Sequence, residues 1–345
     1  MKRLTETGMV TKSFILVFLS ALVATLLLAS TLITCNKKSG SDKNLGRGVK
    51  TVRVATQPGV FAANILLVKV NGYLEDELKN LGVSVKWDSF AAGPPLNEAF
   101  AAGEEDIGLV GDVPLLIAKA SGQKTLAFAK DSYGEKTVAL TVRTDSAITD
   151  LSQLKGKKVA FVKGSYGHHF LGLLLKKAGL IFGDIEQINL PNADIGNTVG
   201  SGQADAGIIW EPGLTSNLKN GTVKILIDGT GIKSNSVYFF TTESFTKDNP
   251  EILKAYLRAL EKANKFIADD PQKTAELLQS EINLPVETLA ELLKSFTFSS
   301  YISDADIAEL KDVEQFNRAE KFSETKVDVD KFIDKSFLES VGITK

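Results

Sequence analysis

The sequence predicts an α/β fold of two similar lobes, each a mainly parallel sheet flanked by helices. Two observations predict it: short β-branched segments alternate with helical patterns beyond residue 50, and this alternation occurs twice. The single cysteine provides no disulfide framework, so the roughly 295 residues after the N-terminal segment must be held together by buried cores. That length suits one large or two medium domains.

The repeat can be followed residue by residue. A strand–loop–helix pattern begins at Val52 and returns 107 residues later at Val159, and Gly72 and Gly179 end the two patterns at the same offset. A second pair of segments, AFAAGEEDIGLVGDVP and NTVGSGQADAGIIWEP, aligns at an offset of 99 residues; it matches Gly103 with Gly202, Asp106 with Asp205, Gly108 with Gly207, and Asp112 with Glu211. Two ordered motifs that recur together indicate two lobes with a cleft between them, where loops after parallel strands bind ligands.

The order of the elements predicts a discontinuous first lobe. Residues 234–242, SNSVYFFTT, are typical of a strand that returns from the second lobe. A helix begins at Asn249-Pro250, because proline suits the first helical position and apolar residues follow at helical spacing. Further helical patterns cover residues 271–282, 285–296 and 303–319. We expect lobe 1 to comprise residues 51–142 plus 236–345 and lobe 2 to comprise residues 143–235.

Residues 1–34 are typical of an export signal, because basic residues precede an uncharged run from Ser13 to Thr34. Cys35 follows in LITC, which resembles a bacterial lipoprotein box whose cysteine is lipidated, although Thr34 replaces the usual smaller residue. Alternatively, the run is an uncleaved membrane anchor, or the cysteine is incidental. Residues 35–50 are polar and suit a lipid-anchored tether. We expect the remainder to lie outside the cytoplasmic membrane.

Charge argues against one class of partner. The formal net charge is −2, and loss of residues 1–34 removes three of 40 basic and one of 42 acidic residues, which leaves −4. A nucleic-acid-binding surface needs a basic excess. We therefore expect no nucleic-acid partner, and we expect a monomer without a cofactor.

Residues 163–170, KGSYGHHF, contain the only two histidines of the chain, His168 and His169. Hydrolysis is disfavoured because no G-x-S-x-G motif surrounds Ser165, and adjacent histidines on a helix point about 100° apart, which disfavours a metal site. Neither nucleotide-binding glycine motif is present. A strand followed by Gly164, Ser165 and a helix start offers free N–H groups and the positive end of a helix dipole to an anion. The alternative is that Ser165 only caps the helix and the histidines lie on its surface.

Four separated segments resemble the aliphatic sulfonate-binding proteins of ABC importers, within the nitrate/sulfonate/taurine group of solute-binding proteins. They are AAGPPLNEAFAAGEEDIGLVGDVP, LSQLKGKKVAFVKGSYGHHFLGLLLKKAGL, SGQADAGIIWEP and NPEILKAYLRALEKA. The resemblance implies a type II periplasmic-binding fold whose lobes close on an anion and deliver it to a permease driven by an ATPase. It implies no catalytic step.

The resemblance also implies site residues. The family motif K-G-S-x-x-H matches Lys163, Gly164, Ser165 and His168; A-G-P-P matches residues 92–95; G-D-x-P matches Gly111, Asp112 and Pro114; and W-D-P appears as Trp210, Glu211 and Pro212. The chain departs from the family at Glu211 and at the Tyr166-Gly167 pair, which leaves the choice of ligand open. We expect these residues to contact ligand: Gln57, Gly93, Pro94, Asp112, Gly164, Ser165, Tyr166, Gly167, His168, Trp210 and Glu211. His169 is expected to pack or to lie on the surface.

Two carboxylates beside an anion need an explanation. Asp112 and Glu211 either accept hydrogen bonds from loop amides, or one of them meets the ammonium group of a taurine-like ligand. The alternatives to a sulfonate-binding protein are a binding protein for taurine or nitrate, an enzyme of the pyrimidine-biosynthesis type on the same fold, and a sensor domain. The enzyme would be expected to supply clustered cysteine and histidine, which the chain lacks.

Overall fold

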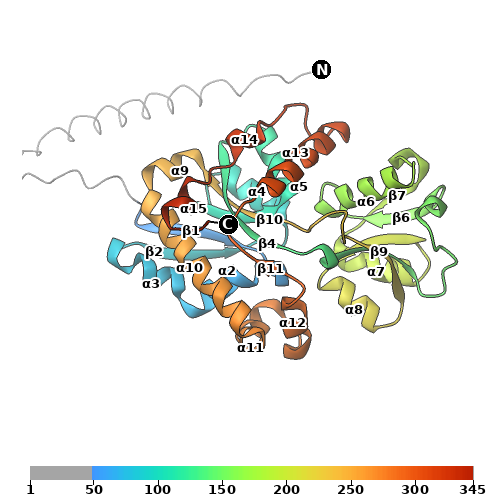
Figure 1. Ribbon diagram of the computed structural model, residues 1–345, viewed down its shortest axis with the longest axis horizontal. Coiled ribbons are helices and arrows are strands. Elements are labelled where there is room, and N and C mark those ends of the chain that lie inside the picture. The colour runs from blue at the N-terminus through green and yellow to red at the C-terminus, as the bar shows by residue number, and fades with distance from the viewer. Residues whose placement is uncertain (1–48, 345) are drawn as a thin grey trace, which may run out of the picture. The chain divides into compact units, whose positions relative to one another are not determined.

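The computed structural model describes residues 49–344. This part of the chain forms two lobes, and the first sheet lies in one of them (Figure 1). Its strand order is β11-β4-β10-β3-β1-β2, and β2, β1, β3 and β4 run in one direction while β10 and β11 run in the other. The strands are β1 (Thr51–Thr56), β2 (Ser84–Ser89), β3 (Ile107–Gly111), β4 (Thr125–Tyr133), β10 (Val237–Thr242) and β11 (Thr297–Phe298). The expected export signal, Cys35 and most of the tether lie outside the described residues.

The second sheet repeats this arrangement. Its order is β7-β6-β8-β5-β9, with β5 antiparallel to both of its neighbours. The strands are β5 (Val138–Arg143), β6 (Lys158–Phe161), β7 (Glu186–Asn189), β8 (Ala206–Trp210) and β9 (Val223–Asp228). The five strands β2-β1-β3-β10-β4 correspond to β7-β6-β8-β5-β9, and in both sets the fourth strand, β10 or β5, runs against its neighbours. The expected two-lobed α/β fold with mainly parallel sheets is therefore present.

The chain crosses from the first lobe to the second earlier than expected. β5 belongs to the second sheet, so the first crossing falls between β4 and β5, at residues 134–137, rather than at residue 142. The periodicity of VALTVR shows a strand but not the sheet that it joins, because pairing is a long-range choice. The second crossing, residues 229–236, ends where expected, since β10 lies in the first sheet.

Helices cover both sheets. Those of the first lobe are α2 (Ala63–Asn71), α3 (Tyr73–Leu78), α4 (Gly93–Ala101), α5 (Asp112–Ala120), α9 (Glu243–Asp248), α10 (Pro250–Asp269), α11 (Pro271–Ile282), α12 (Val286–Leu293), α13 (Asp304–Ala319), α14 (Val329–Phe332) and α15 (Ser336–Ser340). Those of the second are α6 (Tyr166–Lys177), α7 (Asn192–Gly200) and α8 (Gly213–Lys219). Short 3₁₀ turns cover Val60–Ala62, Lys79–Leu81, Glu135–Thr137, Leu151–Leu154 and Phe182–Asp184. Among residues 49–344, no helix combines the length and apolarity needed to cross a bilayer.

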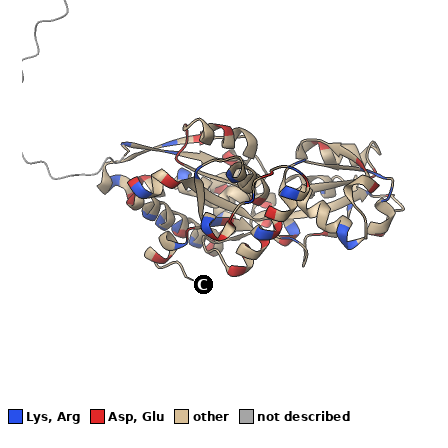
Figure 2. Cartoon of the chain, turned by 90° about the horizontal axis from the view of Figure 1, so that it is seen from above, with Lys and Arg blue, Asp and Glu red and all other residues tan. Residues whose placement is uncertain are grey.

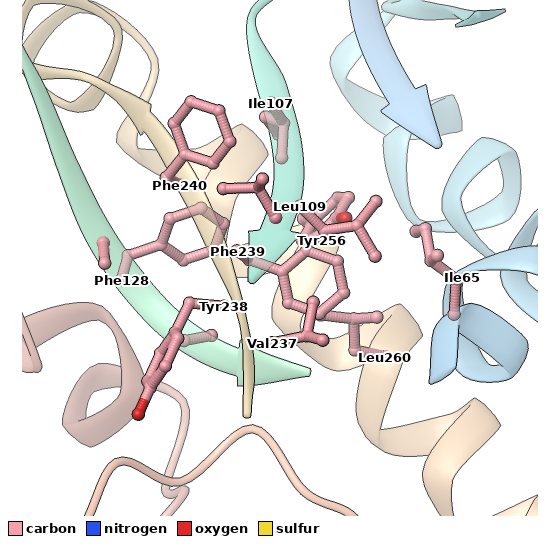
Figure 3. Close-up of a cluster of buried hydrophobic side chains, with 14 of the residues drawn as sticks. Ile65, Ile107, Leu109, Phe128, Val237, Tyr238, Phe239, Phe240, Tyr256 and Leu260 are labelled. Atoms are coloured by element: carbon pink, nitrogen blue, oxygen red, sulfur yellow. The ribbon is translucent and has the colours of Figure 1, made fainter. Parts of the chain in front are cut away.

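The first lobe holds the larger core. Figure 3 shows Phe239 of β10 and Tyr256 of α10 packed together, with ring centroids 5.3 Å apart, and Leu109 of β3 beside them. Acidic and basic residues are interspersed along both lobes (Figure 2), in keeping with the small net charge. The core fixes β3 and β10 side by side, and their ends therefore provide a rigid support for a site.

The repeat extends to individual bonds. Asp106, just before β3, accepts a hydrogen bond from the backbone N–H of Arg53 at 2.9 Å, and Asp205, just before β8, accepts one from Lys158 at 2.8 Å. Gly72 and Gly179 follow α2 and α6 with φ of 67° and 70°, a conformation that favours glycine. These two aligned pairs, Asp106 with Asp205 and Gly72 with Gly179, thus have the same structural roles in the two lobes.

Candidate functional site

The first turn of α6 presents backbone donors at the end of β6. Gly164 has φ of 74°, which turns the chain toward the helix, and Ser165 is the N-cap. Ser165 Oγ accepts a hydrogen bond from His168 N at 3.3 Å and donates one to the Val162 carbonyl at 2.7 Å. The N–H groups of Tyr166 and Gly167, at the first two helical positions, have no acceptor within residues 49–344. Ser165 is therefore a helix cap, while the two residues after it retain donors for a ligand.

Tyr166 connects this helix start to the first lobe. Its ring lies 4.9 Å from the Trp210 ring, centroid to centroid, and its Cδ1 lies 3.5 Å from the point where a Cβ on Gly111 would stand. Gly111 ends β3, so the carboxyl end of a first-lobe strand meets the amino end of a second-lobe helix. The Tyr166 hydroxyl is buried near the Asn235 side chain, which opposes the rise in the Tyr166 pKa, but it forms no hydrogen bond of ordinary geometry among the described residues. A poorly paired donor therefore lies between the lobes.

The expected first-lobe residues gather at the same strand end. Gln57 Nε2 donates to the Leu109 carbonyl at 2.8 Å. A Cβ on Gly93 would lie 2.7 Å from Val110 Cγ2, so only glycine lets the start of α4 approach β3 this closely. Pro94 follows as an exposed residue in the first turn of α4. Gln57, Gly93 and Tyr166 thus all contact the last three residues of β3.

Both expected carboxylates already have partners. Glu211, 6% exposed, accepts hydrogen bonds from Thr215 N at 3.0 Å and Thr215 Oγ1 at 2.8 Å, which fixes the turn between β8 and α8. Burial raises the pKa of Glu211, and the bonds from Thr215 oppose that rise. Asp112 Oδ2 accepts from Lys233 Nζ at 2.5 Å, and its Oδ1 accepts from Val113 N at 2.7 Å. The arrangement favours a structural role for both groups over contact with a ligand ammonium.

Sequence reasoning missed Lys233. Its Nζ also donates to Glu309 Oε1 at 2.9 Å, and the side chain is 1% exposed. Burial lowers the pKa of Lys233, but the charges of Asp112 and Glu309 outweigh it and leave the pKa above its ordinary value. The three residues are separated by 121 and 76 positions along the chain, so no sequence spacing could have indicated the cluster.

His168 lies in an aromatic enclosure. Its ring is fully buried, with the ring centroids of Phe161 and Phe182 each 4.7 Å away, Phe316 5.2 Å and Phe322 5.3 Å. Nδ1 accepts a hydrogen bond from Gly164 N at 3.3 Å. Burial, with smaller effects of the Lys163 and His169 charges, lowers the pKa of His168 to about 4. His168 Nε2 has no hydrogen-bond partner among the described residues, and Glu320 Oε2 lies 4.0 Å from it. The mainly aromatic enclosure holds the ring neutral, which does not favour the expected contact with an anion.

His169 has the packing role expected of it. It is 2% exposed, lies 4.8 Å from the Phe316 ring, and pairs through Nε2 with Asp312 Oδ2 at 3.0 Å. No cluster of three histidine, cysteine, aspartate or glutamate side chains within the described residues is arranged to hold a metal ion.

A family match assigns the chain. The model of the family described as NMT1/THI5 like matches residues 62–274, more than half of the sequence. The chain belongs to the NMT1/THI5-like family. The matched residues include the end of β3, the start of α6 and Trp210, so the candidate site lies within the NMT1/THI5-like region.

The relatives are mostly named as binding proteins. The chain is 30% identical to a putative aliphatic sulfonates-binding protein of Escherichia coli K12, over 71% of this chain and 75% of the relative. It is 29% identical to a putative aliphatic sulfonates-binding protein of Bacillus subtilis 168, over 88% and 90%. A more distant relative, 24% identical over 63% and 66%, is a 4-amino-5-hydroxymethyl-2-methylpyrimidine phosphate synthase of Saccharomyces cerevisiae. The resemblance found in the motifs is thus confirmed.

Solved structures share the fold. The periplasmic aliphatic sulphonate binding protein of Escherichia coli superposes with a TM-score of 0.76 at 26% identity, covering 83% of this chain and 92% of that one. The alkanesulfonate-binding protein of Xanthomonas axonopodis pv. citri bound to MOPS gives 0.74 at 25% identity, covering 83% and 98%. The expected type II periplasmic-binding fold is therefore confirmed.

Proposed function

We propose that this protein is the extracytoplasmic solute-binding component of an ABC importer and that it captures an aliphatic sulfonate between its lobes. One observation carries the proposal: the N–H groups of Tyr166 and Gly167 at the start of α6 lack acceptors, and the Tyr166 hydroxyl is buried between the lobes with only Asn235 near it. The sulfonate-binding names of the relatives support this class of ligand. A permease and its ATPase are the partners that such a component requires, and we expect the protein to act as a monomer.

The donors at the start of α6 suit a sulfonate headgroup. Three oxygens can accept from two backbone amides and a phenol, and the positive end of the helix dipole favours the negative charge. Each charge-assisted hydrogen bond contributes about 1.5–3 kcal/mol, so three of them, less the cost of ordering, are compatible with micromolar affinity, about −8 kcal/mol. The Trp210 ring and Pro94 provide apolar cover for the alkyl chain. Since the Tyr166 ring fills the space between Gly111 and Trp210, binding requires the lobes to part there.

The site favours alkanesulfonates over taurine. Taurine carries an ammonium group, which gains from a free carboxylate, whereas Asp112 and Glu211 are both occupied by protein donors. Binding and release require no bond to be broken, so the proposed role is capture rather than catalysis.

A thermal-shift screen tests the proposal. The protein from residue 46 onward is heated with ethanesulfonate, taurine, nitrate, sulfate or methylphosphonate. A ligand at one hundred times its Kd stabilises the folded state by about 2.7 kcal/mol. We expect the largest shift with ethanesulfonate, followed by calorimetry to give its Kd. If none of these oxyanions changes the melting temperature, the protein is not the binding component that we propose.

A further inference from the structure

Lys233 joins three separate parts of the fold. It lies on the segment that returns from the second lobe to β10, and it binds Asp112 at the start of α5 and Glu309 on α13. Lys233 and Asp112 are each 1% exposed, whereas Glu309 is 23% exposed. Lys233 shares one positive charge between two carboxylates. Burial raises the pKa of Glu309, which is partly exposed, so Lys233 compensates chiefly Asp112, which is out of contact with water.

Asp112 also lies next to the proposed ligand site. It follows Gly111, which contacts the Tyr166 ring, and its N–H donates to the Ser236 carbonyl at 3.3 Å. The pKa of Tyr166 is raised first by burial and next by the charge of Asp112, which places the two groups within electrostatic range. An unpaired carboxylate here would repel an anion at the start of α6 and attract a cation.

We propose that Lys233 makes the ligand site prefer anions to zwitterions by occupying Asp112. The inference rests on the proposed function, since it concerns the same site. With Lys233 in place, an alkanesulfonate meets no net repulsion from Asp112, and the ammonium of an aminoalkanesulfonate finds no carboxylate. Glu211 does not substitute for Asp112, because both of its oxygens accept from Thr215. Lys233 is thus a positioning residue that determines specificity without contacting the ligand.

The test compares ethanesulfonate with taurine, which has the same two-carbon sulfonate plus an ammonium group. Calorimetry on the wild type is expected to give the lower Kd for ethanesulfonate. In Lys233→Met, the Kd for ethanesulfonate should rise by about tenfold or more, because Asp112 is left charged beside it. The Kd for taurine should rise less, because its ammonium can pair with the freed carboxylate. The Kd for taurine divided by the Kd for ethanesulfonate should therefore fall, or drop below one. Adding Asp112→Asn to Lys233→Met should restore the wild-type ratio.

Lys130→Met is the matched control. Lys130, on β4, is also a buried lysine paired with a carboxylate, Asp306. Its charge acts on Glu309, but Asp112 keeps its partner Lys233 when Lys130 is lost. Its loss should leave the ratio of the two Kd values unchanged. If Lys233→Met raises the two Kd values by the same factor, or changes neither, Lys233 is only structural and the inference is wrong. If the wild type binds neither ligand, it is the proposed function that fails.

The single substitution Asp112→Asn tests the inference even if Lys233→Met does not fold. Asp112→Asn keeps Lys233 and removes the negative charge, so ethanesulfonate should bind at least as tightly as in the wild type, while taurine does not gain. An equal loss of affinity for both ligands in this variant would overturn the inference.

Discussion

At the scale of single residues, the site depends on groups left without partners. Tyr166 packs against Trp210 and Gly111, yet its buried hydroxyl, near Asn235, forms no hydrogen bond of ordinary geometry among residues 49–344. Ser165 was expected to serve either a ligand or the helix, and its hydroxyl has both a donor and an acceptor inside the protein. The residue that differs from the family motif is therefore a better candidate for ligand contact than the residue that matches it.

Replacement of Tyr166 by phenylalanine tests this assignment. The ring and its packing remain, so the free energy of unfolding should change little, but one hydrogen bond to the sulfonate is lost. We expect Kd for ethanesulfonate to rise by about three- to tenfold, equivalent to roughly 0.5–1.5 kcal/mol. Tyr256→Phe is the control, because Tyr256 is also buried and also lacks a hydroxyl partner, but it packs in the first-lobe core against Phe128 and Phe239. Equal effects of the two substitutions would argue against the site.

At the scale of elements, α13 holds the lobes together. Asn317 on α13 donates to the Val113 carbonyl of α5 at 3.2 Å, and Asp312 pairs with His169 of α6. Phe316 fills the space above Gly172, where a Cβ would come within 3.0 Å of its ring. One helix therefore contacts both lobes, and His168 lies buried at that contact.

This contact makes stability depend on pH. Folding keeps His168 neutral down to about pH 4, whereas an unfolded histidine titrates near 6.5. Below pH 6.5 the unfolded chain binds a proton that the folded chain refuses, so the free energy of unfolding falls as pH decreases from about 6.5 to about 4. The loss is at most about 1.4 kcal/mol per pH unit for one group. His169 acts in the same direction, because burial lowers its pKa despite the pair with Asp312.

Proton NMR of the histidine rings measures this directly, because the chain has only two histidines. A His169→Gln variant assigns the remaining resonance to His168. We expect that resonance to show no titration between pH 7 and pH 5, with denaturant curves that give lower stability at pH 5 than at pH 7. Titration of His168 near pH 6.5 in the folded protein would contradict the buried enclosure.

At the scale of the whole molecule, the fold is two copies of one arrangement joined by two crossings. The sheet orders β2-β1-β3-β10-β4 and β7-β6-β8-β5-β9 correspond strand for strand. Ends of β3 and α6 then face each other across the junction, so a ligand bound there would contact both lobes. This arrangement suits capture by closure, in which the ligand stabilises the closed form by its contacts with both halves.

The expected membrane anchoring depends on the N-terminal segment that contains Cys35. If Cys35 is lipidated, the full-length protein should appear in the membrane fraction of cells, and Cys35→Ser should shift it to the soluble or secreted fraction with ligand binding intact. An uncleaved apolar anchor would keep the Cys35→Ser variant in the membrane. The distribution of the two proteins after cell fractionation distinguishes these cases.

The sequence by itself determined the duplicated α/β lobes and several of their helices. Pro250 begins α10, and residues 271–282 form α11, because proline positions, capping residues and apolar spacing act within a few turns of chain. The recurring Asp106 and Asp205 were visible for a different reason: the duplication repeats them at a fixed offset, although each bonds a residue 53 or 47 positions away. Local interactions leave a local signal in the sequence.

Only the tertiary structure decided how the site is charged and where the lobes divide. Asp112 appeared to be a carboxylate facing an anion until Lys233, 121 residues away, was found to neutralise it. His168 matched a family motif, yet Phe316 and Phe322 from the far end of the chain enclose it. The strand β5 belongs to the second sheet because it pairs with β8 and β9, which are distant from it in sequence. Partners distant in sequence set burial, pairing and pKa, and no local pattern specifies which distant residues will meet.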